Sequence, residues 1–109
     1  MQAEGRRFES ARLQVSLGVH MPSSDLNARM YFDQGRQSFS GRDFESACDQ
    51  FKRAVDCDPM YHEAHRYLAE SFEKLGYRNR ARKAWEALLR ITRDDSQLSD
   101  IRQRLQSLQ

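Results

Sequence analysis

The chain has 109 residues, a length typical of a single domain. Its hydrophobic fraction of 39% and charged fraction of 31% are typical of a soluble helical protein, and five glycines and two prolines leave few turns for a strand-rich fold. The net charge of +2 requires neither nucleic acid nor a membrane surface as a partner, although 15 of the 18 basic residues are arginines.

Residues 1–25 precede the first regular helix and allow three interpretations. Segment 8–11 repeats the sequence Phe-Glu-Ser-Ala of segment 44–47, which favours a packed helix from a degenerate earlier repeat. Apolar residues alternate over 13–19, as they do in a strand, and His20-Met21 resembles the junction of a non-native leader. A packed helix, a mobile arm and a partly non-native extension therefore remain open.

Capping and breaking residues divide the rest of the chain into five predicted helices. Ser23-Ser24-Asp25, Asp43 and Asp94-Asp95-Ser96 supply side-chain acceptors for exposed helix N–H groups. Gly41 ends the first helix, and Pro59 ends the second because the residue before a proline is pushed out of the α region. The last helix carries one apolar stripe, as a terminal capping helix requires. The predicted spans are about 26–40, 44–57, 61–75, 79–92 and 96–109.

Two stretches, 28–61 and 62–95, share a pattern with a period of 34 residues. A small residue is followed 12 positions later by an alanine and four positions after that by a large aromatic residue. Repeats of this length predict stacked helix–turn–helix units, in which small residues let two helices approach and large residues fill the space around the crossing. The matching pairs are Gly35 and Ala69, Ala47 and Ala81, and Phe51 and Trp85.

Together with further signature positions, this pattern resembles the tetratricopeptide repeat (TPR). In the first unit the matching residues are Tyr31, Gly35, Ala47, Phe51, Ala54 and Pro59. In the second unit they are Leu68, Ala69, Phe72, Gly76, Ala81 and Trp85. The resemblance covers about 68 of the 109 residues. It implies an all-α fold, an α-solenoid of about two antiparallel helix–turn–helix repeats over 26–95, with a C-terminal capping helix over 96–109.

The chain also departs from the family pattern. Gln34 and Ser38 stand where the family prefers leucine and tyrosine, which suggests that the N-terminal segment covers the front of the first repeat. Leu88 replaces a small residue and Arg93 replaces the closing proline, as suits a last repeat packed on a capping helix. Because two repeats are fewer than the three usually needed for stability, the terminal segments or a second copy should complete the stack.

In proteins of this family the first helix of each repeat lines a concave groove. The resemblance therefore implies a groove with an aromatic and arginine half beside an acidic half. Its residues are Arg29, Phe32, Arg36 and Phe39 from the first repeat and Glu63, Arg66, Glu70 and Glu73 from the second. A peptide with an acidic or C-terminal carboxylate end could pair with the arginines. Alternatively, Phe32 and Phe39 pack against residues 8–19 and the charges form an ordinary solvated face. The carboxylate clamp of chaperone-binding family members is not reproduced.

Other polar clusters have weaker claims to function. A basic group of Arg78, Arg80, Arg82 and Lys83 could meet RNA or an acidic partner, but we expect a solvated outer turn. His62 and His65 share a helix face without a complete set of metal ligands, so no metal site is expected. Cys48 and Cys57 lie about 13 Å apart along one helix, too far to form a disulfide. We expect both to be buried structural thiols.

No enzyme motif accompanies the repeats: there is no P-loop, dinucleotide fingerprint, nucleophile elbow or carboxylate dyad. We therefore expect no catalytic residue and no cofactor. No run approaches the ~20 apolar residues of a membrane span, and no secretory signal is recognisable, so the expected location is cytoplasmic. The predicted function is a non-enzymatic adaptor or chaperone-like module that binds a partner's peptide. The alternatives are a self-assembling scaffold, whose termini fill a neighbour's groove, and, more weakly, an Arg-mediated nucleic-acid binder.

Overall fold

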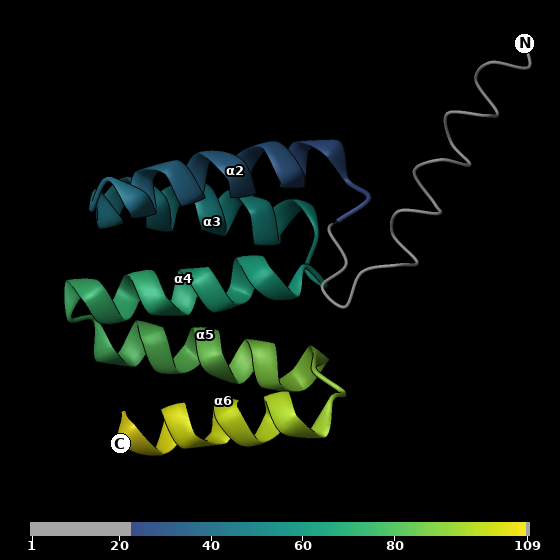
Figure 1. The fold of residues 1–109 in the computed structure, drawn as a ribbon, viewed down its shortest axis with the longest axis vertical. Helices are drawn as coiled ribbons and strands as arrows, with labels where there is room; N and C mark the ends of the chain where they lie inside the picture. Colours follow the sequence, from purple (N-terminus) through teal and green to yellow (C-terminus); the bar gives the residue numbers. More distant parts are fainter. Residues whose placement is uncertain (1–22, 109) are drawn as a thin grey trace, which may run out of the picture.

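The computed structural model describes residues 23–108, and these residues form the five predicted helices with no strand among them (Figure 1). The bounds are α2 Leu26–Ser40, α3 Phe44–Cys57, α4 His62–Leu75, α5 Arg78–Ile91 and α6 Asp95–Ser107. The all-α fold with antiparallel helix pairs and a C-terminal capping helix is confirmed. The three interpretations of the N-terminal segment concern residues 1–25, of which 1–22 lie outside the described part.

The predicted caps fix the starts of α2, α3 and α6, whereas α4 and α5 begin after Tyr61 and Tyr77 without a side-chain cap. The Asp25 carboxylate accepts a hydrogen bond from the Ala28 N–H at 3.0 Å, and Asp43 and Asp94 cap α3 and α6 in the same way. Each such cap contributes about 1 kcal/mol to helix stability. At the other end of α4, Gly76 has a φ of 82°, the left-handed conformation that favours glycine after a helix.

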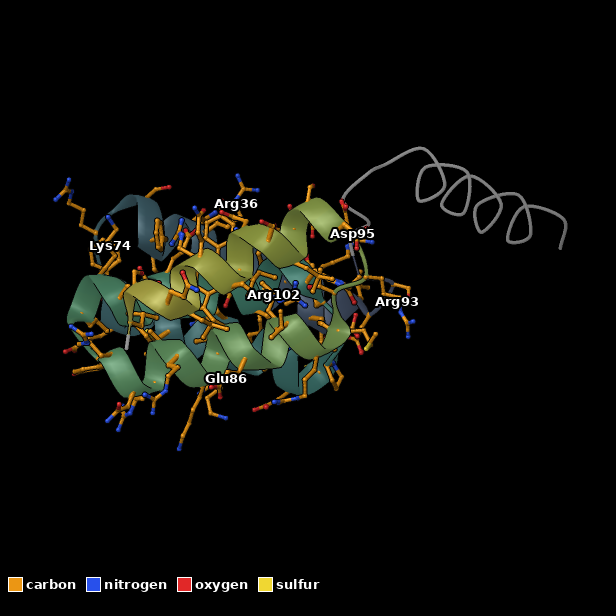
Figure 2. All side chains as sticks on the ribbon, turned by 90° about the horizontal axis from the view of Figure 1, so that it is seen from below. Arg36, Lys74, Glu86, Arg93, Asp95 and Arg102 are labelled. Carbon is orange, nitrogen blue, oxygen red and sulfur yellow. The ribbon has the colours of Figure 1, made fainter. Side chains whose placement is uncertain are left out.

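Consecutive helices pack against each other in an up-and-down stack (Figure 1). α2 also contacts α4, and side chains of α4 pair with side chains of α6. In contrast, α3 and α5 do not pack against each other. The molecule therefore has two distinct sides, which we call the α2–α4–α6 face and the α3–α5 face. Figure 2 shows Arg36 of the first face and Glu86 of α5 on opposite sides of the molecule.

The small residues of the repeat lie at the helix crossings, as predicted. A Cβ atom added to Gly35 would lie 2.6 Å from the Phe51 ring, so α2 can approach α3 this closely only with glycine at the crossing. Ala47, Ala69 and Ala81, the other small residues of the repeat pattern, are all fully buried. Close packing of this kind leaves no space for an additional methyl group.

An aromatic cluster joins the first helix pair to the second. Phe51 of α3 stacks on Tyr67 of α4 with ring centroids 5.2 Å apart. Phe32 of α2 lies 4.9 Å from Tyr61 and 5.5 Å from Tyr67, and Phe39 lies 5.4 Å from Tyr67. Each such ring pair adds about 0.5–1.5 kcal/mol beyond the burial of its surface, so the two helix pairs form one continuous core.

The second helix pair is closed by α6 around a fully buried tryptophan. Trp85 donates a hydrogen bond from Nε1 to the Glu73 carboxylate. The guanidinium carbons of Arg66 and Arg104 lie 5.6 Å and 5.0 Å from the centroid of the Trp85 ring, within the range of cation–π attraction. Ile101 of α6 is fully buried and belongs to the same hydrophobic core as Trp85. α6 therefore covers the end of the stack.

Candidate functional site

The first half of the predicted groove contains two exposed arginines, one of which lies over a buried ring. Arg29 and Arg36 are exposed on α2, and the Arg36 guanidinium lies 5.8 Å from the centroid of the Phe32 ring. Phe32 itself is only 4% exposed, and Phe39 is half-buried against the same core. Both rings are held by Tyr67 of the next helix pair, so Phe32 offers a partner almost no surface.

The second half of the predicted groove is tied to the capping helix. Arg66 pairs with Asp100 of α6 at 3.3 Å. Arg104 of α6 pairs with Glu70 at 3.8 Å and with Glu73 at 3.6 Å. All five residues in these three ion pairs are at least partly exposed, so each ion pair contributes at most about 1 kcal/mol. These three ion pairs therefore fix the orientation of α6 on α4 but add little to the free energy of folding.

A cavity of about 330 Å³ opens between α4 and α6 on the same face. Three of the predicted groove residues, Glu63, Arg66 and Glu70, line it together. The other lining residues are His62, Tyr67, Leu88 and Gln97. This volume is at the lower limit for a ligand pocket, and the charged lining suits a polar side chain. The structure thus brings together the acidic half of the predicted groove and places Arg29 and Arg36 on the neighbouring helix.

A larger groove, of about 730 Å³, lies on the α3–α5 face, where no site was predicted. α3 and α5 form its walls and α4 forms its floor. Its lining residues are Glu45, Cys48, Asp49, Lys52, Val55, His65, Leu68, Phe72, Leu75, Tyr77, Arg80, Lys83, Ala84 and Ala87. In the sequence, the only indication of this groove is the short side chains of α3 and α5, the second helix of each repeat. The repeat pattern explains these side chains by helix packing alone.

The basic cluster at the start of α5 borders this groove. Arg78, Arg80 and Lys83 are exposed and Arg82 is partly buried. The Arg80 guanidinium carbon lies 5.2 Å from the centroid of the Tyr77 ring, so the one aromatic residue beside the cluster is already covered by an arginine. Tyr77 is 42% exposed, and a nucleic-acid base would have to displace Arg80 to stack on that side of the ring.

Both histidines of α4 bind main-chain carbonyl groups. His62 Nε2 lies 2.9 Å from the Ile91 carbonyl oxygen and His65 Nε2 lies 2.8 Å from that of Pro59, so each ring donates from Nε2. Burial lowers the pKa of His65 below its ordinary value of 6.5. Among residues 23–108, no group of three His, Cys, Asp or Glu side chains is arranged to hold a metal ion.

The two cysteines are free thiols in different surroundings. Cys48 is 8% exposed, and burial raises its pKa to about 11, so it stays protonated and unreactive. Cys57 is exposed, which corrects the expectation that both thiols are buried. The reason is that Cys57 is the last residue of α3 and its side chain lies beyond the packed turns of that helix.

No helix within the described residues is both long enough and apolar enough to cross a lipid bilayer. No protein-family model matches the chain, and no curated protein is significantly similar to it.

Proposed function

We propose that this chain is a TPR-like protein-binding module that performs no chemistry and acts as an adaptor or chaperone-like subunit. It holds a peptide segment of a partner protein on the α2–α4–α6 face. The observation that carries the proposal is the pair of exposed arginines on α2, Arg29 and Arg36, presented by a helix whose other side is packed on an aromatic core. The free thiols fit the reducing, cytoplasmic location expected from the sequence.

The spacing of the two arginines suits a carboxylate-bearing peptide. They are seven residues apart, which places them about 10 Å from each other along the same side of α2. Arginine binds carboxylates through two parallel hydrogen bonds, which gives direction as well as affinity. An acidic or C-terminal carboxylate end would therefore bind over α2. A polar side chain of the same peptide could enter the cavity beside Arg66.

The proposal is tested by affinity capture from the native lysate with a charge-reversed variant. Arg29→Glu/Arg36→Glu changes only exposed positions and leaves the buried Phe32 in place. The matched control is Arg93→Glu/Arg102→Glu, the same charge change at exposed positions away from α2. Figure 2 shows all three of Arg36, Arg93 and Arg102 on different parts of the surface. Partners captured by the wild type and the control but lost with the α2 variant support the proposal. Equal capture by all three proteins contradicts it.

Self-association as a scaffold is a second candidate, because α2 carries two exposed apolar side chains. Leu26 is 64% exposed and Met30 is 52% exposed, one helical turn apart. A second copy that covered them would complete the short stack. Light scattering over a wide range of protein concentrations tests this candidate with the wild type and a Leu26→Lys/Met30→Lys variant. A wild type that stays monomeric throughout rejects it, whereas a dimer that the variant abolishes supports it.

A further inference from the structure

The groove on the α3–α5 face has the shape of a trough with an apolar floor. Leu68, Phe72 and Leu75 of α4 form the floor. Short side chains also line the trough, with Cys48 on α3 and Ala84 and Ala87 on α5. Since α3 and α5 do not pack against each other, nothing from the described residues closes the trough.

The two rims of the trough carry opposite charges. Glu45 and Asp49 lie on the α3 side, where Lys52 also lines the groove but pairs with Asp56 of its own helix at 3.7 Å. Arg80 and Lys83 lie on the α5 side. Glu45, Asp49, Arg80 and Lys83 are all exposed, and no ion pair between described residues joins one rim to the other. A molecule lying in the trough would therefore meet an acidic rim on one side and a basic rim on the other.

We propose that this groove docks an amphipathic α-helix of a partner protein. Its apolar stripe would lie on Leu68 and Phe72, with basic side chains toward the α3 rim and acidic side chains toward the α5 rim. The lining residues of α3 run from Glu45 to Val55, about 15 Å along the helix, so the trough accommodates about three turns. Helix-in-groove recognition uses an apolar stripe of this length, and rim charges set the direction of the bound helix.

A second copy of this chain fits the trough less well than a partner helix does. The exposed large apolar side chains among residues 23–108 are Leu26, Met30, Met60 and Tyr77. Only Leu26 and Met30 share a helix, and together they cover one turn, whereas the trough has room for about three. The proposed site also lies on the opposite side from Arg29 and Arg36, so it is independent of the peptide-binding face.

The test measures fluorescence anisotropy with the full chain and synthetic helices as probes. The first probe has a leucine stripe flanked by lysines on one side and glutamates on the other. The second has the same stripe with glutamates on both flanks, and the third is a scrambled sequence. We expect the first probe to bind, the scrambled one not to bind, and Ala87→Trp, which fills the trough, to weaken binding at least tenfold. Equal binding of the first and scrambled probes would overturn the proposal.

A charge reversal keeps the test valid if the tryptophan variant is unstable. Glu45→Lys/Asp49→Lys makes both rims basic at exposed positions, so it should weaken the first probe several-fold and strengthen the second. The control is Glu86→Lys/Arg90→Glu, two exposed positions of α5 that do not line the groove. The variant Arg29→Glu/Arg36→Glu should bind the first probe as the wild type does. If only that variant loses binding, the probe lies on the other face and the groove assignment is wrong.

A photo-reactive residue at position 87 identifies any occupant from the chain itself. In the protein alone, a cross-link to residues 1–22 of the same chain or to a second chain would reassign the groove to that occupant and overturn the proposal. With the first probe present, a cross-link to the probe supports the proposal.

Discussion

Gly35→Ala tests the closest helix contact of the fold with a single added methyl group. A Cβ atom at position 35 would lie 2.6, 2.7 and 3.0 Å from three atoms of the Phe51 ring. The ring cannot move away easily, because Phe51 is fully buried and stacks on Tyr67. The substitution must therefore shift α2 away from α3 or force Phe51 out of its preferred conformation.

Two opposing contributions set the expected size of the effect. Overpacking a well-packed core costs about 1–3 kcal/mol, and three contacts at or below 3.0 Å place this site in the upper part of that range. Replacing glycine by alanine within a helix returns about 0.5–1 kcal/mol. The net destabilisation should be about 1–2 kcal/mol, which lowers the Tm of a domain of this size by about 4–16 °C.

Thermal and urea unfolding followed by circular dichroism measure this change, with Gly41→Ala as the control. Gly41 has a φ of −83°, and the nearest atom to an added Cβ atom is 3.6 Å away, so the control should stay within about 0.5 kcal/mol of the wild type. If Gly35→Ala melts at or above the wild-type temperature, helix propensity dominates. The Phe51 ring then cannot lie against Gly35 as described.

Three further predictions concern single side chains. Arg42 has a φ of 66°, a left-handed conformation that costs a non-glycine residue about 1–2 kcal/mol. Arg42→Gly should therefore raise the free energy of unfolding, measured in urea, by about 0.5 kcal/mol or more. A lower free energy of unfolding would contradict this prediction. Burial lowers the pKa of His65, so the unfolded chain binds the proton more tightly and stability should fall as pH decreases through and below 6.5. His65→Gln should weaken that acid dependence, and an unchanged slope between about pH 7.5 and about pH 5.5 would refute the assignment. A thiol reagent should label Cys57 quickly and Cys48 only on unfolding, and Cys57→Ser should abolish the fast phase; a persistent fast phase would show that Cys48 is accessible.

The helices were predictable from sequence because local chemistry determines where they begin and end. Asp25, Asp43 and Asp94 each cap the helix that follows, and Gly76 adopts the left-handed conformation that ends α4. The small residues of the repeat were equally readable, since only glycine or alanine fits at a close crossing. Gly35 shows this most directly.

The surfaces were less predictable because they depend on how neighbouring helices meet. From the sequence, Phe32 could face either solvent or the next helix pair. It packs against the Tyr67 ring of the next pair, and Tyr67 is not a signature position of the repeat. Glu70 and Glu73 were expected to face a partner, but Arg104 of the capping helix reaches both of them. No local pattern indicates where a terminal helix will place one arginine.

The groove on the α3–α5 face has the same origin. Ala84 and Ala87 are ordinary helix residues in the sequence, and they form part of a trough only because α4 holds α3 and α5 apart. Such a site follows from the spacing of three helices and has no motif of its own.

The central claim, that the α2–α4–α6 face binds a partner's peptide, is tested most directly by cross-linking from the middle of α2. Asp33 is exposed between Arg29 and Arg36, so a photo-reactive residue there would lie against a bound peptide. In the native lysate, we predict a discrete adduct with a partner protein from position 33 and none from position 86, an exposed position of α5 on the opposite side of the molecule (Figure 2). The adduct should disappear when Arg29→Glu/Arg36→Glu is added. No adduct at position 33, or the same adduct at position 86, would contradict the claim.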